Sequence, residues 1–221
     1  EAGDVKHPYH YERSDFYKWL SGYKLKYAPG TKSVYSNVGF GFLGLILSNV
    51  AHMDYQDLII KELCDPLNMP DTRMTFSAEQ KERLSDFYSK TGKMIHAGCC
   101  ISLPALGGGG AFASTLNDMS RFLAFNMGLL KTNMNDALTI LHKTQFTMGP
   151  ADYIGLGWYD NKLYPNSSIM KISKNGGMPG VSTYLAFVKE SKTGVVVLAN
   201  TDSEPTVPLG NEILKIMNPS K

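Results

Sequence analysis

Residues 174–200 read KNGGMPGVSTYLAFVKESKTGVVVLAN, and two segments of this stretch carry a clear strand pattern. Residues 181–189 and 194–200 are rich in β-branched and aromatic side chains and are separated by charged and polar residues, which is typical of two strands joined by a turn. Residues 155–159, GLGWY, predict a further strand upstream, and residues 208–217 predict a closing helix. The end of the chain is therefore expected to be an antiparallel sheet followed by a helix.

Helical periodicity dominates the part of the chain before this sheet. Apolar residues recur at helical spacing in residues 15–24, 38–50, 55–64, 115–127 and 135–143. We interpret residues 38–50 as a buried helix whose glycines permit close packing. The helix at 55–64 is expected to stop before Pro66, and Ser114 or Thr115 can cap the helix that follows them. Residues 73–100 are mixed and predict short strands and loops.

This order of elements predicts an α+β protein in which a helical region precedes an antiparallel sheet and a C-terminal helix. Residues 1–145 are expected to form a mainly helical lobe. Residues 146–221 are expected to form the C-terminal part of the lobe that contains the sheet. The sequence shows no internal repeat and no low-complexity linker between the two.

The composition limits the function classes. The chain has 221 residues, of which 43% are hydrophobic and 19% are charged, which fits a compact globule rather than a disordered segment. A net charge of +2, with no run of basic residues between aromatics, argues against a nucleic-acid partner. No run of 18 apolar residues predicts a membrane-spanning helix.

Cysteine and histidine positions argue against a metal site. Cys64, Cys99 and Cys100 have no C-x-x-C spacing and no histidine at ligand spacing beside them, and their odd number leaves at least one free thiol. The adjacent pair fits either small buried residues in a glycine-rich loop or a redox pair. Five histidines are scattered without metal spacing and are expected at the surface or in packing: His7, His10, His52, His96 and His142. We therefore expect no metal and no cofactor.

Three local patterns could carry chemistry, although each also has an ordinary structural interpretation. Tyr35-Ser36-Asn37 stands before a predicted helix and could be a cap with a packed ring. Lys174-Asn175-Gly176-Gly177 contains Asn-Gly, a common hairpin signal. A third pattern is the glycine run at residues 107–110. From the residues alone, both interpretations stay open.

Their order and surroundings resemble class C β-lactamases and their penicillin-binding relatives. Pro29-Gly30-Thr31 followed by Tyr35-Ser36-Asn37 is similar to the family's second motif region. The later landmarks follow in order: Pro66-Leu67-Asn68-Met69, Gly109 to Thr115, Asp118, Arg121-Phe122, Gly155 to Trp158, and Lys174 to Gly180 in the place of the Lys-Thr-Gly strand. The resemblance implies a β-lactamase/transpeptidase-like fold that lacks its N-terminal strands.

The resemblance also implies a chemistry. In this family a serine of a Ser-x-x-Lys motif attacks an amide or ester carbonyl, and the motif lysine and the tyrosine of Tyr-x-Asn share its proton. It implies that Tyr35 is a general base and then a general acid, and that Asn37 hydrogen-bonds the substrate's amide side chain. Lys174 would supply positive charge near Tyr35 and toward a substrate carboxylate. A tyrosine can act as a base near neutrality only where a neighbouring cation favours its phenolate.

The glycines after Lys174 have implied roles as well. Gly176 and Gly177 lack side chains, so an extended substrate could lie against the strand, and the Gly177 N–H would be one oxyanion donor. Asn175 stands where the family has Thr or Ser, so a hydroxyl that would contact a substrate carboxylate is replaced. After Asn200 the sequence lacks the additional Asn and Arg that class C β-lactamases carry, which argues against efficient β-lactam hydrolysis.

A nucleophile is missing from this pattern. Only 34 residues precede Tyr35, whereas the Ser-x-x-Lys motif should lie some tens of residues earlier. Ser21-Gly22-Tyr23-Lys24 matches the motif by letters, but we interpret it as accidental because it ends a short helix. Lys192-Thr193-Gly194 likewise spells the third motif but stands at a turn. We expect the serine on an upstream segment, which is either a separate chain or a piece of the same protein.

Three hypotheses remain. The first is a serine hydrolase acting on β-lactams, D-amino-acid peptides or esters, inactive as this chain alone and, by resemblance, periplasmic or secreted. The second is a non-catalytic relative or inactive fragment that only binds. The third is an unrelated α+β binding domain, which predicts that Tyr35, Lys174 and Gly177 lie far apart. Without the upstream segment, an apolar edge and face should be exposed.

Overall fold

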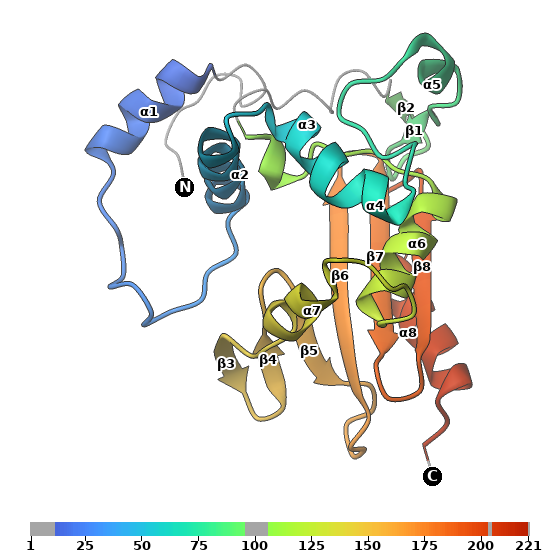
Figure 1. Cartoon of the computed structure of the whole chain (residues 1–221). Coiled ribbons are helices and arrows are strands. Elements are labelled where there is room, and N and C mark those ends of the chain that lie inside the picture. The colour runs from blue at the N-terminus through green and yellow to red at the C-terminus, as the bar shows by residue number, and fades with distance from the viewer. Residues whose placement is uncertain (1–11, 96–105, 203–204, 221) are drawn as a thin grey trace.

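The fold is known from a computed structural model, which describes residues 12–95, 106–202 and 205–220. A six-stranded antiparallel sheet has the order β3-β4-β5-β6-β7-β8, so each strand pairs with its neighbour in sequence. Its strands are β3 (Phe146–Gly149), β4 (Asp152–Ile154), β5 (Tyr159–Lys162), β6 (Met170–Met178), β7 (Val181–Val188) and β8 (Thr193–Ala199). Helices cover the upper end and both faces of this sheet (Figure 1). The predicted fold class is confirmed.

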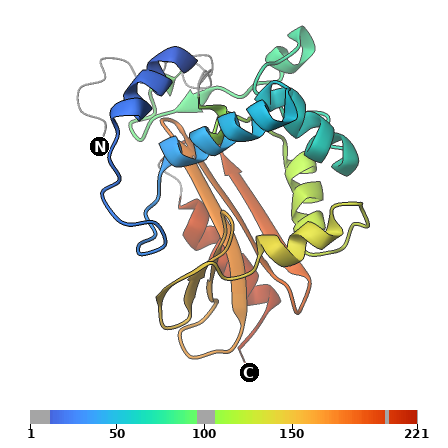
Figure 2. The same cartoon turned by 60° about the vertical axis from the view of Figure 1, so that its left-hand side comes forward.

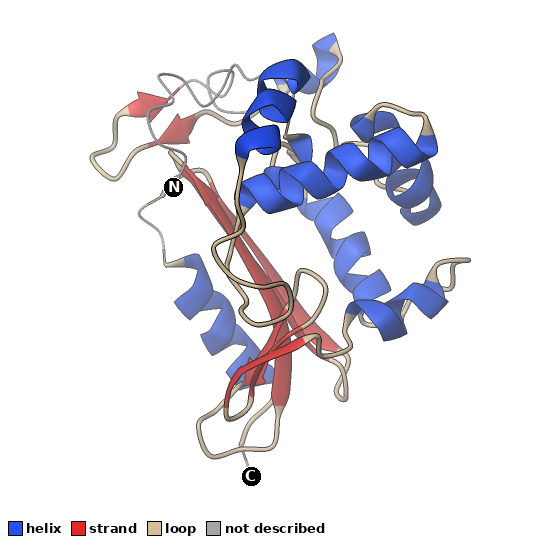
Figure 3. Ribbon diagram, turned by 90° about the vertical axis from the view of Figure 1, so that its left-hand side faces the viewer, coloured by secondary structure: helices blue, strands red, loops and turns tan. Residues whose placement is uncertain are grey.

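Successive apolar side chains of β7 point to opposite faces of the sheet, which explains why helices pack on both faces. Tyr184, Ala186 and Val188 are buried with Leu214 of α8 (Thr206–Met217) in one apolar cluster. The side chains between them point to the opposite face, where Leu185 and Phe187 pack with Leu123 of α6 (Leu116–Asn126) in another cluster. Figure 3 shows the sheet nearly edge-on with helices on both sides.

The remaining helices form the region that precedes the sheet. They are α1 (Arg13–Gly22), α2 (Asn37–Ala51), α3 (Tyr55–Ile59), the π-helical segment Ile60–Cys64, α4 (Asp65–Leu67), α5 (Ala78–Glu82), the 3-10 helix Gly107–Gly109 and α7 (Asn135–Leu141). The five predicted helical segments are confirmed within a few residues. Thr115 caps α6, since its hydroxyl accepts a hydrogen bond from the Asp118 N–H at 3.3 Å. The division of the chain into lobes at residue 145 stays a prediction.

Several local predictions were wrong. The helical conformation predicted for 55–64 does not stop before Pro66 but continues to Leu67. The π-helical segment ends at Cys64, and Pro66 lies at the start of the short α4 that follows it. Residues 155–159 are not a strand: Gly157 has φ +82 and the strand begins only at Tyr159. Residues 73–95 contain the short hairpin β1 (Phe87–Tyr88) and β2 (Met94–Ile95), as expected, but also the unpredicted helix α5. Its capping box, Ser77 with Gln80, was the missed signal.

Helix α2 has one buried and one exposed apolar stripe, so the prediction of a buried helix is confirmed for one side and wrong for the other. One stripe is buried, and there a Cβ on Gly41 would lie 2.6 Å from Leu106 Cβ, while one on Gly44 would lie 3.3 Å from the Gly108 backbone. The predicted close packing at these glycines is thus confirmed. A second apolar stripe is at least 42% exposed at every member: Phe40, Leu43, Ile46, Leu47 and Val50. We call it the exposed α2 stripe. The view in Figure 2 shows α2 crossing above the sheet.

Among the residues that the structure describes, no helix is both long enough and apolar enough to cross a bilayer.

Candidate active site

Tyr35 and Asn37 stand at the entrance to α2. The Ser36 hydroxyl accepts a hydrogen bond from the Gly39 N–H at 2.9 Å and so caps the helix, which turns the residues on either side outward. The Tyr35 hydroxyl donates to Asn37 Oδ1 at 2.7 Å, and the Tyr35 side chain is 63% exposed. The cap predicted from this tripeptide therefore exists, but Ser36 makes it, and the side chains of Tyr35 and Asn37 are hydrogen-bonded to each other instead.

Lys174 lies in the middle of β6, not in a turn. The Asn-Gly hairpin interpretation was wrong, because Asn175 and Gly176 pair with Tyr184 and Thr183 along β7, and the chain reverses only after Met178. Lys174 shares its face of the sheet with Leu185, its partner on β7, and so points toward the helical side. At this position on the strand, the ammonium lies near Tyr35, just before the N-terminus of α2.

The ammonium of Lys174 meets the Tyr35 ring. Its Nζ atom lies 4.9 Å from the Tyr35 ring centroid and 5.4 Å from the centroid of Tyr159. Partial burial lowers the pKa of Lys174 below its ordinary value. Within residues 12–95, 106–202 and 205–220, no carboxylate forms an ion pair with it. Among those residues its positive charge is therefore unpaired beside Tyr35.

The C-terminal half of β6, residues 174–178, is paired on the β7 side but not on the β5 side. Strand β7 pairs with β6 as far as Met178, whereas β5 pairs with it only from Met170 to Ser173. No described strand pairs with residues 174–178 on the β5 side, so their backbone groups there could bind an extended chain. This unpaired edge begins at Lys174 itself.

The two glycines of this edge differ. A Cβ on Gly176 would lie 2.7 Å from the Thr183 Oγ1, so this glycine is needed for the neighbouring strand. A Cβ on Gly177 would come no closer than 3.6 Å, to the Val181 oxygen, so the sheet itself leaves room there. The substrate role predicted for both glycines is therefore compatible with the space at Gly177, whereas packing already explains Gly176.

A cavity of about 620 Å³ adjoins this strand on its helical side. Its walls are mostly apolar, and they come from the sheet and from the segment at residues 110–114. Lys174, Asn175 and Gly176 line one part of it, and Trp158, Phe122 and Leu198 line another. Tyr35 and Asn37 do not line it, so the cavity lies beside the Tyr35–Lys174 pair rather than at it.

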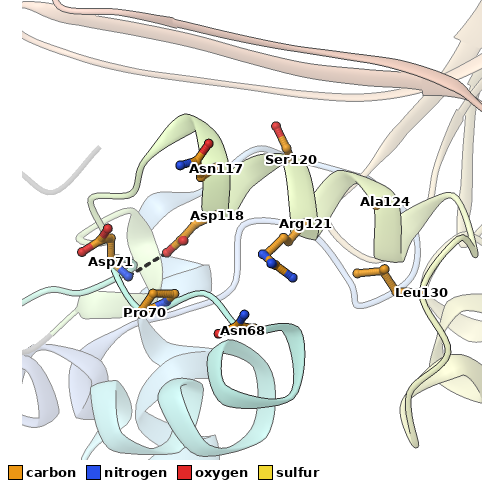
Figure 4. A pocket seen from close by; sticks show the side chains of 9 residues that line it. All are labelled: Asn68, Pro70, Asp71, Asn117, Asp118, Ser120, Arg121, Ala124 and Leu130. Atoms are coloured by element: carbon orange, nitrogen blue, oxygen red, sulfur yellow. Dashed lines mark hydrogen bonds between the residues drawn. The ribbon is translucent and has the colours of Figure 1, made fainter.

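A second hollow, of about 490 Å³, is lined by several polar side chains, and its carboxylates are hydrogen-bonded or paired with other groups of the protein (Figure 4). Asp118, which is 2% exposed, accepts hydrogen bonds from the Asp71 N–H and the Thr72 hydroxyl, each at 2.8 Å. Asp71 in turn pairs with Arg83 at 2.5 Å, and this partner lowers the pKa of the Asp71 carboxyl. Arg121 and Asn68 line the rest of the hollow. Its carboxylates hold α6 to the preceding loop, so we do not assign chemistry to it.

The remaining reactive side chains have packing environments. Cys64 is fully buried among the helices, and burial raises the pKa of its thiol. His142 lies between Trp158 and Phe187, with its Nε2 3.1 Å from Asn126 Oδ1, and burial lowers its pKa to about 4. Cys99 and Cys100 lie outside the described residues. Within those residues, no group of three His, Cys, Asp or Glu could hold a metal ion.

The predicted site residues come together from distant parts of the sequence. Tyr35 and Lys174 are in contact, Asn37 is bonded to Tyr35, and Gly177 follows on the same strand. The hypothesis of an unrelated domain predicted that these residues lie far apart, and it was wrong. Tyr159 was missed; its place directly after Gly-Leu-Gly-Trp was the available signal.

The structure gives the positions of the two sequence matches that were interpreted as accidental, at Ser21 and at Lys192. Ser21 is in the last turn of α1, its hydroxyl donates to the Lys18 carbonyl oxygen, and the helix ends at Gly22. Lys24 therefore does not follow Ser21 on one helix. Lys192 has φ 53 in the turn between β7 and β8, as expected.

Comparison with known proteins identifies the family of this chain. The sequence profile of the Beta-lactamase family matches residues 2–215. The D-alanyl-D-alanine-carboxypeptidase/endopeptidase AmpH of Escherichia coli K12 is 33% identical over 199 residues, covering 84% of this chain and 50% of that protein. Penicillin-binding protein 4* of Bacillus subtilis is 24% identical over 200 residues, covering 84% of this chain and 43% of that protein.

Solved structures show the same relationship. A class C beta-lactamase superimposes with a TM-score of 0.83 at 26% identity, covering 100% of this chain and 66% of that one. The D-alanine carboxypeptidase AmpC from Burkholderia cenocepacia gives 0.81 at 23% identity, covering 93% and 66%. The chain thus spans about half the length of the curated relatives that it matches.

Proposed function

Because this chain belongs to the Beta-lactamase family, we propose that it forms the larger part of a serine acyl-transfer hydrolase for amide or ester bonds. The observation that carries the proposal is the Lys174 ammonium, 4.9 Å from the Tyr35 ring at the start of an unpaired strand edge. A cation beside a phenol makes that phenol a usable proton acceptor. An open strand edge beside them suits an extended, peptide-like substrate.

The proposed reaction has two halves. Tyr35 first loses its own proton to solvent, and the Lys174 ammonium stabilises the phenolate. A serine hydroxyl then attacks the carbonyl carbon while this phenolate takes the serine proton, and the Gly177 N–H stabilises the resulting oxyanion. The carbonyl re-forms, the bond to the amine or alcohol breaks, and the leaving group takes the proton back from Tyr35. Water then attacks the acyl-serine with Tyr35 again as base, which releases the acid and regenerates the serine.

Asn37 can serve this cycle because an amide has both an acceptor and a donor end. In the resting protein its Oδ1 accepts from the Tyr35 hydroxyl. Its Nδ2 is then the end that can donate to an amide oxygen of the substrate. Lys174 attracts a substrate carboxylate toward β6, and D-alanyl peptides, β-lactams and some esters carry one. Because Asn175 replaces a hydroxyl residue, we propose a peptidase or esterase with weak β-lactam hydrolysis.

We place the nucleophilic serine on a Ser-x-x-Lys segment outside these 221 residues. Ser21 and Lys24 do not share a helix, and Ser168 and Lys171, which have the same spacing, lie before and within strand β6. Neither match by letters within this chain is therefore a Ser-x-x-Lys helix. A helix that is apolar on two sides is normally buried, so the exposed α2 stripe supports the packing of additional polypeptide there. The mostly apolar cavity beside Lys174 supports the same proposal. By resemblance, we propose a periplasmic or secreted location.

The test is covalent labelling of the full-length protein with a fluorescent penicillin, followed by intact mass and peptide mapping. We expect one adduct, on a serine outside residues 1–221, and no adduct on the 221-residue chain alone. Tyr35→Phe should slow labelling strongly. Tyr27→Phe, a change at another exposed tyrosine of the same loop, is the matched control. An adduct on Ser21 would overturn the assignment of the nucleophile.

The second candidate is a non-catalytic binding protein. It is favoured by the lack of a Ser-x-x-Lys helix among the described residues. Reversible binding of a penicillin or a D-alanyl peptide to the full-length protein, with no mass increase at long times, would support it over the hydrolase.

A further inference from the structure

Two aromatic rings flank the ammonium of Lys174. The ring centroid of Tyr35 lies 4.9 Å from Nζ, and that of Tyr159 lies 5.4 Å away. Both distances are within the range in which a ring face attracts a cation. No ion pair of this ammonium occurs in the described parts of the chain, where the structure shows its contacts with these two rings.

The two rings are not equally fixed. Tyr35 is 63% exposed and precedes α2, in the helical region. Tyr159 is partly buried and begins β5, where its backbone pairs with Ser173, the residue immediately before Lys174. Trp158, directly before it, is buried against Phe122 and Phe187. The Tyr159–Lys174 contact is therefore set within one sheet, whereas the Tyr35–Lys174 contact depends on how the sheet meets α2.

We propose that Tyr159 is a positioning residue, whose ring holds the Lys174 ammonium in place beside Tyr35. A lysine side chain has four rotatable bonds and could otherwise turn into solvent along the unpaired edge of β6. With the ring present, the cation is already located when Tyr35 takes the serine proton. The catalytic consequence rests on the proposed function, but the contact between Tyr159 and Lys174 does not.

The first test measures the contact without any activity. Phenylalanines with zero to three ring fluorines replace Tyr159 in the full-length protein, and the pKa of Lys174 is followed by NMR of ¹³Cε-labelled lysine. Fluorine withdraws electrons from the ring face while nearly preserving its size, so burial of the lysine stays the same and only the attraction weakens. We expect the pKa of Lys174 to fall stepwise with each fluorine. The same series at Tyr153, on the neighbouring strand β4, is the control and should leave it unchanged.

The second test measures the consequence. Tyr159→Leu should lower the rate of penicillin acylation about tenfold, equivalent to about 1.4 kcal/mol, whereas Tyr159→Phe should stay within about twofold of the original protein. If the leucine variant does not fold, the fluorine series supplies the rates instead. A constant Lys174 pKa across that series overturns the positioning role, whatever the labelling shows. A stepwise fall in a protein that never acylates upholds the contact and refutes the hydrolase.

Discussion

Replacing Lys174 by methionine removes the charge beside Tyr35 while keeping a long, unbranched side chain. Two unit charges about 5 Å apart interact by about 3 kcal/mol at an effective dielectric constant of about 20. Lys174 is only partly buried, so solvent screening reduces this to about 2 kcal/mol. If Tyr35 carries negative charge in the transition state, that loss slows acylation about 30-fold.

The assay is single-turnover labelling of full-length Lys174→Met by a fluorescent penicillin, read at saturating and at limiting probe. Loss of transition-state stabilisation lowers the rate in both regimes, whereas loss of carboxylate attraction alone lowers it only at limiting probe. Lys171→Met is a less suitable control because Lys171 is buried and its ammonium donates a hydrogen bond to Asn161 Oδ1. Lys162→Met, an exposed change at the far end of β5, is the better control and should label normally. Labelling of Lys174→Met at the original rate would refute the assigned role of the charge.

Three further predictions concern stability and the glycine edge. Asp118→Ala should lower the free energy of unfolding by about 3 kcal/mol, because two hydrogen-bond donors lose their buried carboxylate partner. Asn117→Ala, on the same helical turn, should change it by less than about 0.5 kcal/mol, and urea unfolding measures both. His142 has a pKa of about 4 when folded, against about 6.5 when unfolded, so below about pH 6.5 the unfolded chain binds the extra proton and stability falls. We expect a loss of about 1 kcal/mol between about pH 7 and about pH 5, after allowing for partial solvent screening. A comparable loss in His142→Gln, which does not titrate, would contradict this explanation. Gly176→Ala should cost about 1–2 kcal/mol of stability, because its Cβ would approach Thr183 Oγ1. Gly177→Ala should leave the thermal midpoint nearly unchanged but slow acylation. Equal shifts of the thermal midpoint in the two variants would show that the edge is not open at Gly177.

Local signals predicted many of the elements but misjudged their ends. Periodicity located the five upstream helices, because each buries one face and repeats its apolar residues accordingly. The strand prediction failed at Gly155 to Trp158, where apolar and aromatic composition could not reveal that Gly157 has a positive φ. It also failed at Asn175-Gly176, where a turn signal lies inside a nine-residue strand. Pairing with β7 outweighed the local turn preference there.

The sequence by itself determined the order of elements, the family resemblance and the identity of the candidate residues, since these depend on periodicity and on motifs along the chain. The tertiary structure alone brought Tyr35 against Lys174, 139 positions later in sequence, and added Tyr159 to the pair. It alone showed that α2 keeps an exposed apolar stripe, because burial depends on what packs against a helix and not on the helix's own composition. Likewise, the free edge of β6 exists because β5 stops pairing at Ser173, and strand pairing is a property of two segments that no single segment encodes.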